Sequence, residues 1–446
     1  MKIAGIIAEY NPFHNGHRYH IEETKRRTGC DAVVVVMSGD FVQRGVPAVM
    51  DRYLRAEAAL RCGADVVLEL PAYGATASAE DFASAGVRAL DGLSCVDVVS
   101  YGAEDAALGE HTFRSIAQFL IDEPGAFKQT LLAHVREGNS YAKARSMALS
   151  EFFPEAAELL AKPNNILAVE YEKAILTLES SDRNRTKAQT ASGDAGEPLE
   201  RNNPRNPVRQ PISNNTGDPV RARIASCAIS RSDLGYHDTT VGEVCSATAI
   251  RNALSDGGLV PAEAVPAEAL PLYAGLTAAT AVTADDFSDM LFAELSSHTT
   301  ESLAGIYDVP ADLANRILEQ AQSPFTWTSL AESVKCKAYT RSRIDRALCH
   351  CLLHLTTADA DIFRKRDLPY LRVLGFRKDA EQLLSTMEHS SRIPLLIRFL
   401  RDSAKLTGDA AHILTADLRA SSLYSQILYR KVGIIREDAH RRLLTV

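Results

Sequence analysis

The first hundred residues alternate between short, mostly apolar runs and segments in which apolar residues recur at helical spacing. The apolar runs occupy residues 2–7, 31–37, 65–70 and 96–100, and such runs are typical of strands that a parallel sheet buries on both faces. Helical patterns lie between them, through residues 19–24, 51–62 and 79–90. The repeated alternation predicts an α/β fold with a Rossmann-like, doubly wound parallel sheet.

The pattern changes twice further along the chain. Between about residues 180 and 222 the sequence is rich in Arg, Asn, Pro, Ser and Gly and almost lacks apolar periodicity, which predicts a disordered or mobile insertion. Residues 224–230 are expected to form a last strand. From residue 261 apolar residues return at helical spacing. We therefore expect an α/β domain over residues 1–260 and a mostly α-helical C-terminal region over residues 261–446.

Composition and charge narrow the class of protein only slightly. The chain has 446 residues, 46% of them hydrophobic, and a net charge of −8, which argues against a protein that coats nucleic acid indiscriminately but leaves room for a local basic surface. We expect no DNA partner. No stretch approaches the roughly 18 apolar residues of a membrane helix, and the N-terminus lacks a signal-peptide pattern. A cytoplasmic protein without a membrane partner is expected.

Eight cysteines are scattered without a Cys-x-x-Cys pair, which predicts reduced thiols. One cluster places His350 and His354 four residues apart, beside Cys349 and Cys351. On a helix the cysteines would point away from the face that the histidines share, and the surrounding leucines indicate packing. We expect a packed helix there, and no metal site is predicted.

The first candidate catalytic residues lie in the turn between the first predicted strand and the first helix. His14 and His17 lie three residues apart around Gly16, so both side chains would point from the helix N-terminus, which favours anions. A histidine there can donate a hydrogen bond to a phosphoryl oxygen. Two exposed histidines beside an Asn-Gly turn are the alternative. The strand before the motif and the helix after it favour a nucleotide site in which His14 and His17 are catalytic.

Loops that follow other predicted strands offer further contacts, because ligands bind at the carboxyl ends of strands in open α/β sheets. In residues 38–45, Asp40 and Arg44 are candidates for contacts to a triphosphate or a second substrate, although Gly39 and Gly45 are equally compatible with plain turns. Gly102 follows the fourth strand, where it is either a turn glycine or a point of close approach to a nucleotide.

Three more segments carry polar candidates. Asn164 or Asn165 is either the N-cap of the next helix or a residue whose amide contacts a base edge or ribose. Arg231 stands at the end of the last predicted strand. Residues 246–251 open a helix whose first-turn amides, hydroxyls and Arg251 form a second candidate phosphate-binding end.

Two of these segments resemble known motifs. Residues 13–17 are similar to the HxGH motif of the nucleotidyltransferase superfamily, and residues 246–251 resemble its ISSTxxR-like phosphate motif. A longer set of segments, in one order along the chain, resembles the bacterial tRNA(Met) cytidine acetate ligase family: residues 8–17, 37–39, 43–45, 162–167, 235–238, 339–344 and 369–376.

The resemblance implies a two-step ligase. Such an enzyme activates acetate with ATP, accompanied by Mg²⁺, to acetyl-adenylate, and it passes the acetyl group to the wobble cytidine of elongator tRNA(Met), forming N4-acetylcytidine. ATP, acetate and elongator tRNA(Met) are the implied partners. Two alternatives stay open: an adenylyltransferase acting on another small phosphorylated or carboxylate substrate, and a non-catalytic tRNA-binding protein.

The resemblance also implies an ATP site in a nucleotidyltransferase-like domain over residues 1–260. The insertion is a departure from the family, and Arg231 is followed by Ser232, Asp233 and Leu234 rather than small residues, so its assignment depends on residues 235–238. The implied ATP-binding residues are Ile7, Ala8, Glu9, Tyr10, Asn11, Pro12, Phe13, His14, Asn15, Gly16, His17, Arg18, Tyr19, His20, Gly102, Asn164 and Arg231.

A basic cluster in the C-terminal region is the candidate for tRNA contact. Tyr339 lies among its cations, a combination suited to phosphates and an unstacked base. A solvated basic helix face is the alternative. The cations are Lys335, Lys337, Arg341, Arg343 and Arg346.

Overall fold

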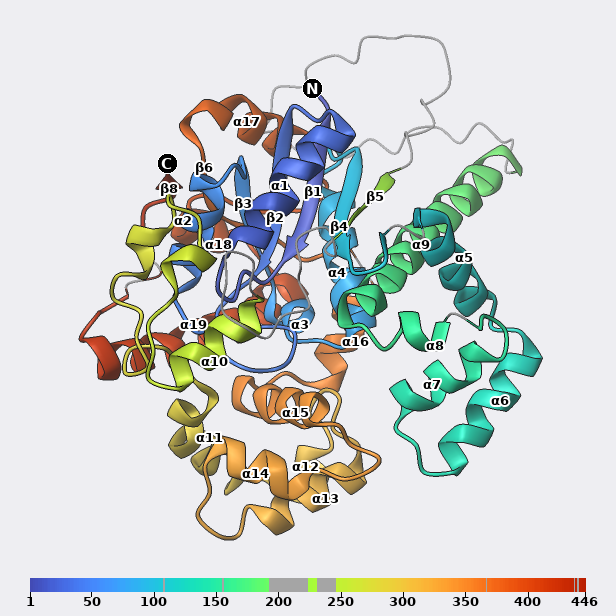
Figure 1. Ribbon diagram of the computed structural model, residues 1–446, viewed down its shortest axis with the longest axis vertical. Helices are drawn as coiled ribbons and strands as arrows, with labels where there is room; N and C mark the ends of the chain where they lie inside the picture. Colours follow the sequence, from blue (N-terminus) through green and yellow to red (C-terminus); the bar gives the residue numbers. More distant parts are fainter. Residues whose placement is uncertain are drawn as a thin grey trace.

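Five parallel strands form one side of an eight-stranded sheet, from the edge strand β5 to β3 (Figure 1). The computed structural model describes residues 1–106, 109–154, 156–191, 224–230, 246–365, 367–436, 438 and 441–446. The strand order is β5-β4-β1-β2-β3-β6-β7, and β8 pairs with β6. The strands are β1 (Ile3–Ala8), β2 (Ala32–Ser38), β3 (Val66–Leu70), β4 (Val98–Ala103), β5 (Ala225–Ser230), β6 (Leu371–Phe376), β7 (Leu395–Leu396) and β8 (Leu444–Thr445).

Helices connect the parallel strands and cover both faces of the sheet, which confirms the predicted doubly wound α/β architecture. The helices of this half are α1 (Asn15–Thr28), α2 (Arg52–Arg61), α3 (Ala72–Ala75), α4 (Ala79–Gly92), α5 (Gly109–Asp122), α6 (Gly125–Arg136), α7 (Tyr141–Ser150), α8 (Ala156–Leu159), α9 (Pro163–Ala191) and α10 (Ala247–Ser255).

Strand β2 shows how the sequence pattern produces the two covered faces. All of its residues are buried. Val34 and Val36 belong to the hydrophobic core that includes side chains of α4, whereas Val33 and Val35 belong to a second core with α1 and α2. Successive side chains of a strand point to opposite faces, so an uninterrupted valine run requires helices on both.

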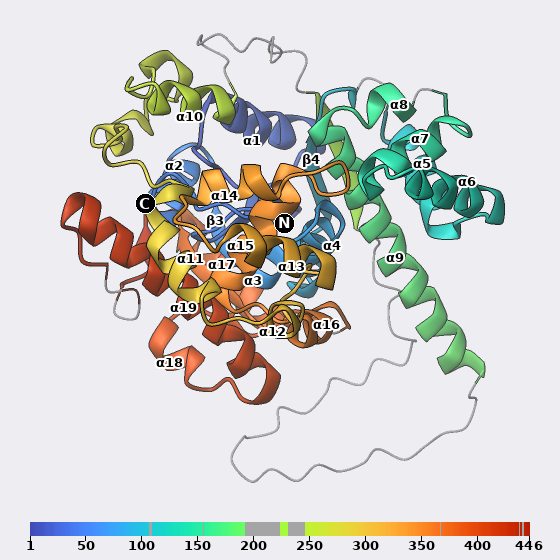
Figure 2. The same ribbon diagram turned by 90° about the horizontal axis from the view of Figure 1, so that it is seen from below.

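Helix α9 corrects the predicted insertion. It continues to Ala191, although residues from about 180 onward were predicted to belong to a disordered or mobile insertion. Residues 180–191 contain neither glycine nor proline, so nothing in them breaks the helix, even without an apolar face. The rest of the predicted insertion lies outside the described residues. Helices α5 to α8 gather beside α9 at one side of the molecule (Figures 1 and 2).

The C-terminal region is mostly helical, as predicted, but it also completes the sheet. Strand β6 pairs antiparallel with β3, and β7 and β8 pair with β6, so the two predicted parts share one sheet. A boundary near residue 260 stays a prediction. The α-helices of this part are α11 (Ser288–Leu295), α12 (Thr300–Leu303), α13 (Ala311–Gln320), α14 (Trp327–Val334), α15 (Arg341–Leu353), α16 (Thr357–Lys365), α17 (Glu381–Ser390), α18 (Phe399–Ser403) and α19 (Gly408–Val432).

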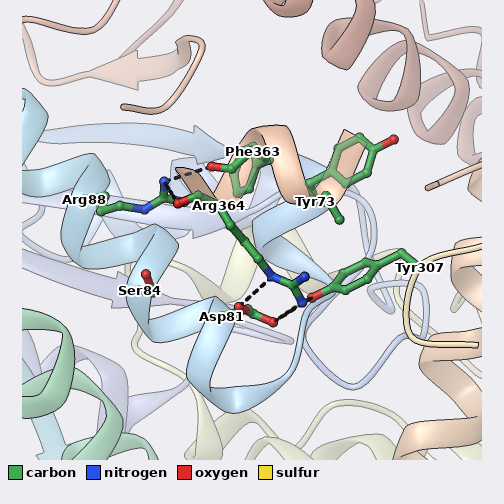
Figure 3. A pocket seen from close by; sticks show the side chains of 8 residues that line it. Tyr73, Asp81, Ser84, Arg88, Tyr307, Phe363 and Arg364 are labelled. Carbon is green, nitrogen blue, oxygen red and sulfur yellow. Dashed lines mark hydrogen bonds and ion pairs between the residues drawn. The ribbon is translucent and has the colours of Figure 1, made fainter. Parts of the chain in front are cut away.

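A polar joint fixes α16 against α4 (Figure 3). Arg364 donates to Asp81 at 2.8 Å, and the Tyr307 hydroxyl donates to the same carboxylate at 2.7 Å. Arg88 donates to the Phe363 carbonyl at 2.8 Å. The space between these side chains has a volume of only about 10 Å³, room for one water molecule at most. The joint therefore holds elements together rather than binding a ligand.

The cysteine and histidine cluster is part of the core of α15. His350 is fully buried, and its two ring nitrogens lie 2.8 Å from the Tyr307 carbonyl and 3.0 Å from the Thr76 carbonyl. Cys349 and Cys351 are buried as well, in agreement with the predicted packed helix. Among the helices that the structure describes, none is long and apolar enough to cross a membrane.

Candidate functional site

A cleft of about 930 Å³ opens at the carboxyl ends of β1 and β4. Its walls come from the β1–α1 turn, the loop after β2, the first turn of α9, the start of α10, the start of α7 and the start of α15. Figure 1 shows α7 and α15 at the same end of the sheet. The cleft therefore lies where an open α/β sheet is expected to bind a ligand.

His14 and His17 lie together in the wall of this cleft. His14 is the N-cap of α1, and its Nδ1 accepts a hydrogen bond from the Gly16 N–H at 3.1 Å. The Nδ1 of His17 accepts from the His14 N–H at 3.3 Å, and the two ring centroids are 3.8 Å apart. Because each Nδ1 is an acceptor, each neutral ring carries its proton on Nε2. The motif thus supplies two Nε2–H donors at a helix N-terminus.

The end of β1 is held by its own polar side chains. Glu9 accepts a hydrogen bond from the Gln43 N–H at 2.9 Å, and the Asn11 side chain accepts one from the Val49 N–H at 2.9 Å. The Asn11–Pro12 peptide bond is cis. These contacts join the β1–α1 turn to the loop after β2, so the two loops form one wall.

Arg55 holds the main chain of this wall, a role that was not predicted from the sequence. The buried guanidinium donates to the Glu9 carbonyl at 2.6 Å and to the Ser38 carbonyl at 3.2 Å, so it connects the ends of β1 and β2. Burial lowers the pKa of the Arg55 guanidinium. The only signal in the sequence is an arginine among the alanines and leucines of α2.

The second predicted phosphate-binding segment lies against the first. Ser246 caps α10 by accepting from the Ala249 N–H at 3.1 Å. Arg251 donates to the Asn11 carbonyl at 2.6 Å and to the Thr248 hydroxyl at 2.9 Å. Burial lowers the pKa of Arg251. Two helix N-termini, those of α1 and α10, therefore border the same cleft.

The structure distinguishes between the two candidate asparagines. The Asn165 side chain accepts from the Glu104 N–H at 3.0 Å and donates to Asp105 at 2.6 Å, so it holds the loop after β4. Asn164 lines the cleft and donates to the Glu104 carboxylate at 2.5 Å. Both lie in the first turn of α9 and neither is its N-cap, because the helix already begins at Pro163.

Comparison with known proteins identifies the family. The sequence profile described as HIGH Nucleotidyl Transferase matches residues 1–191 and 217–438. The chain is 33% identical to the tRNA(Met) cytidine acetate ligase of Acetivibrio thermocellus, over 97% of this chain and 98% of that protein. It is also 33% identical to the ligase of the same name from Thermoanaerobacter sp., over 98% of each chain.

The chain belongs to the tRNA(Met) cytidine acetate ligase family of HIGH nucleotidyltransferases. Solved structures agree with this assignment. The crystal structure of Thermotoga maritima TmcAL bound with alpha-thio ATP has a TM-score of 0.80 and 25% identity, over 100% of both chains. The apo structure of the same protein has a TM-score of 0.81 and 26% identity.

Most of the ATP-binding residues that the family resemblance implies reach the cleft, but some do not. Asn15 donates to the Glu263 carbonyl at 2.7 Å, and Arg18 forms ion pairs with Glu22 and Glu268. Arg231 lies outside the described residues, as do residues 235–238. Pro12, Phe13, Asn15, Gly16, Arg18 and Tyr19 do not form the wall of the cleft. The implied residues that do are Ile7, Ala8, Glu9, Tyr10, Asn11, His14, His17, His20, Gly102 and Asn164.

Gly102 differs slightly from its expected place. It lies within β4, paired with Ile229 of β5, rather than after the strand. The strand is longer than predicted because β5 extends the pairing to Ala103.

Asp40 is not available to a triphosphate, so that prediction is wrong. Its buried carboxylate accepts from Arg52 at 2.8 Å and from Arg436 at 2.6 Å. Burial by itself would raise the pKa of Asp40, but the Arg436 and Arg52 guanidiniums outweigh burial and hold that pKa below its usual range. Asp40 thus ties the loop after β2 to the C-terminal tail. Arg44, by contrast, is exposed and lines the cleft.

The predicted basic cluster divides in two. Arg343 and Arg346 line the cleft and form ion pairs with Asp308 at 3.2 Å and 3.3 Å. Arg341 instead forms ion pairs with Asp345 and Glu332 at 2.8 Å.

Tyr339 is not placed to stack on a base. Its side chain is only 8% exposed, its hydroxyl donates to Asp312 at 2.5 Å, and Arg343 lies over its ring. The suggestion that this ring meets an unstacked base is therefore wrong.

The fit of a magnesium ion to the cleft depends on the nucleotide. No group of three or more His, Cys, Asp or Glu side chains that could hold a metal gathers within the part of the chain that the structure describes. Mg²⁺ is commonly held by one or two carboxylates together with substrate phosphates. Glu9 is the carboxylate of the β1–α1 turn that lines the cleft, so it fits such an arrangement when ATP supplies the other ligands.

Proposed function

We propose that this protein activates acetate with ATP and transfers the acetyl group to the wobble cytidine of elongator tRNA(Met). In the first step a carboxylate oxygen of acetate attacks the α-phosphorus of ATP, and the bond to pyrophosphate breaks. In the second step the N4 amine of cytidine attacks the acetyl carbon, AMP leaves and the amine loses a proton. N4-acetylcytidine, AMP and pyrophosphate are the products, and the tRNA substrate places the reaction in the cytoplasm.

The observation that carries this proposal is the pair of Nε2–H donors that His14 and His17 supply in the cleft. Negative charge builds on the α-phosphate and on departing pyrophosphate during the first step, and fixed donors stabilise it. We assign both histidines to this task. Positioning matters more than a protein nucleophile here, because acetate itself attacks. Mg²⁺ bound with ATP would offset further phosphate charge, with Glu9 the residue suited to hold it.

Family membership supports the substrates. The curated relatives are named for tRNA(Met), cytidine and acetate, and a related structure is bound with an ATP analogue. We infer the same substrates for this chain, since the relatives match it over nearly its whole length.

The test is mass analysis of tRNA(Met) after incubation with the protein, ATP and isotopically labelled acetate. We expect label on the N4 atom of the wobble cytidine, and none when ATP is omitted. Unlabelled tRNA in the complete mixture would overturn the proposal. ATP–pyrophosphate exchange that ignores acetate but responds to a phosphate ester would indicate an adenylyltransferase of another substrate instead. Binding of tRNA without either reaction would indicate a non-catalytic protein.

A further inference from the structure

The cleft extends beyond the residues assigned to ATP, and its far part has an exposed aromatic ring. Tyr141, the first residue of α7, lines the cleft and is 56% exposed. The other phenylalanine and tyrosine residues in the described wall are at most 4% exposed and belong to the core: Tyr10, Phe82, Tyr101 and Tyr171. Tyr141 is therefore the ring of this wall that offers its faces to a ligand.

The start of α15 supplies positive charge to the same cleft. Arg343 and Arg346 share the single carboxylate of Asp308, which leaves an excess of one positive charge. Both side chains are partly exposed, Arg343 by 32% and Arg346 by 12%, so a phosphate in the cleft can reach them.

The segments that precede Tyr141 and the two arginines are in contact. Lys337, in the loop before α15, donates to the Glu137 carbonyl in the turn before α7 at 3.0 Å. A Cβ atom added to Gly138 in the same turn would lie 3.8 Å from the Lys337 Nζ. Tyr141 follows this turn directly, so it stands beside the contact that joins the walls.

We infer that this part of the cleft is the subsite for the acceptor nucleotide of the RNA, an inference that rests on the proposed function. Tyr141 stacks on the unpaired pyrimidine, and Arg343 and Arg346 bind the phosphates that flank it. Proteins that read unpaired RNA bases commonly stack them on aromatic rings, and RNA brings a phosphate on each side of its base. A solvent-exposed ring such as Tyr141 is accessible to a base that belongs to a large RNA.

Replacing Tyr141 tests the stacking. In the complete acetylation reaction, we expect Tyr141→Ala to raise the KM for tRNA(Met) by about 10- to 100-fold, while the KM for ATP at saturating tRNA stays constant. Tyr141→Phe keeps the ring and should restore the KM for tRNA. Tyr429→Ala is the matched control, because Tyr429 is 54% exposed on α19 and lies away from the cleft wall.

Replacing the arginines tests the phosphate contacts. Arg343→Gln and Arg346→Gln should each weaken tRNA binding. Each should also reduce the slope of log Kd against log salt concentration by about 1, the value for one lost phosphate contact. Arg430→Gln on α19 is the control and should leave the slope unchanged.

Three outcomes would overturn the inference. A raised KM for ATP in Tyr141→Ala would mean that the ring stacks on adenine. An unchanged KM for tRNA would remove Tyr141 from the acceptor subsite, and unchanged salt slopes would remove the arginines. Wild-type protein that forms no acetylcytidine would overturn the proposed function itself, and this result is read before any variant is measured.

Discussion

Arg251 and the main-chain carbonyl of Asn11 are joined by a hydrogen bond of 2.6 Å, although 240 residues separate them in the sequence. The bond attaches the start of α10 to the end of β1, so it joins the two segments that were predicted to bind phosphate. A guanidinium fixed in this way acts on the geometry of the histidine motif as well as on the charge of the cleft.

Arg251→Lys tests this attachment. A lysine keeps the charge but cannot donate to both the Asn11 carbonyl and the Thr248 hydroxyl in the same fork geometry. Loss of a charge-assisted hydrogen bond costs about 1.5–3 kcal/mol, so we expect kcat/KM for ATP to fall roughly 10- to 100-fold. This kcat/KM is measured from the incorporation of labelled acetate into tRNA at different ATP concentrations. Arg430→Lys, at an exposed position of α19, should have no effect. Equal values of kcat/KM for ATP in Arg251→Lys and Arg430→Lys would contradict the prediction.

His14 has two tasks, which two substitutions separate. The ring caps α1 through Nδ1 and presents Nε2–H to the cleft. Asparagine is a good N-cap, so His14→Asn should keep the thermal stability yet slow acetyl-adenylate formation by on the order of 100-fold or more. His14→Ala should show the same kinetic loss and also lose about 1 kcal/mol of folding stability. Thermal melts and rates of pyrophosphate release measure the two effects. An active His14→Asn protein would show that Nε2–H is not required.

Local patterns were enough to predict the centre of the sheet and the histidine motif. The valine run of β2 and the strand-to-helix turn before His14 carry their signals within a few residues. Strand β6 is also mostly apolar, apart from Arg372, but its partner β3 belongs to the other half of the chain. Pairing between such distant segments leaves no local periodicity, so the contribution of the C-terminal region to the sheet was not predicted.

Buried charges were the other feature that the sequence could not reveal. Arg55 and Asp40 look like ordinary polar residues because charged side chains are mostly exposed. Their burial depends on partners elsewhere: four main-chain carbonyls for Arg55, and Arg52 and Arg436 for Asp40. Asp40 was therefore considered a candidate ligand contact, and Arg55 was overlooked.

Gly45→Ala should separate the loop after β2 from α15. Gly45 has a φ of +74°, and an added Cβ would lie 2.3 Å from the Cα of Arg346, a contact with backbone that no rotamer change relieves. We expect a loss of about 2–5 kcal/mol of folding stability. Gly29→Ala is the matched control, because Gly29 has a φ of +61° but open space around it, and it should lose only about 1–2 kcal/mol. Chemical denaturation compares them, and equal losses would argue against the close packing.

Asp417 predicts a pH dependence of stability. Burial and, to a smaller extent, the neighbouring Glu69 carboxylate raise the pKa of the Asp417 carboxyl from 3.8 to about 7. The folded state therefore holds this proton more tightly than the unfolded state. The stabilising contribution is complete below about pH 4 and is lost as the pH rises towards 7. It amounts to on the order of 4 kcal/mol at most.

Asp417→Asn should remove this contribution. The carbonyl of an asparagine can still accept the hydrogen bond that the Ala72 N–H donates to Asp417 at 2.7 Å. We expect the melting temperature of the wild-type protein to fall, relative to that of the variant, between pH 4 and pH 7. If the melting temperatures of the wild-type protein and the variant change in parallel between pH 4 and pH 7, the raised pKa of Asp417 is contradicted.

The pairing of β3 with β6 has a consequence for synthesis on the ribosome. Strand β3 is wholly apolar except for Glu69, and all its residues are buried in the complete fold. Its edge remains without a partner until Leu371 and the residues after it have left the exit tunnel, because β6 is the strand that covers it. Exposed apolar edges are sites of aggregation. The nascent chain thus carries an open sheet edge through most of its translation, and this edge closes only when the last part of the chain has been made.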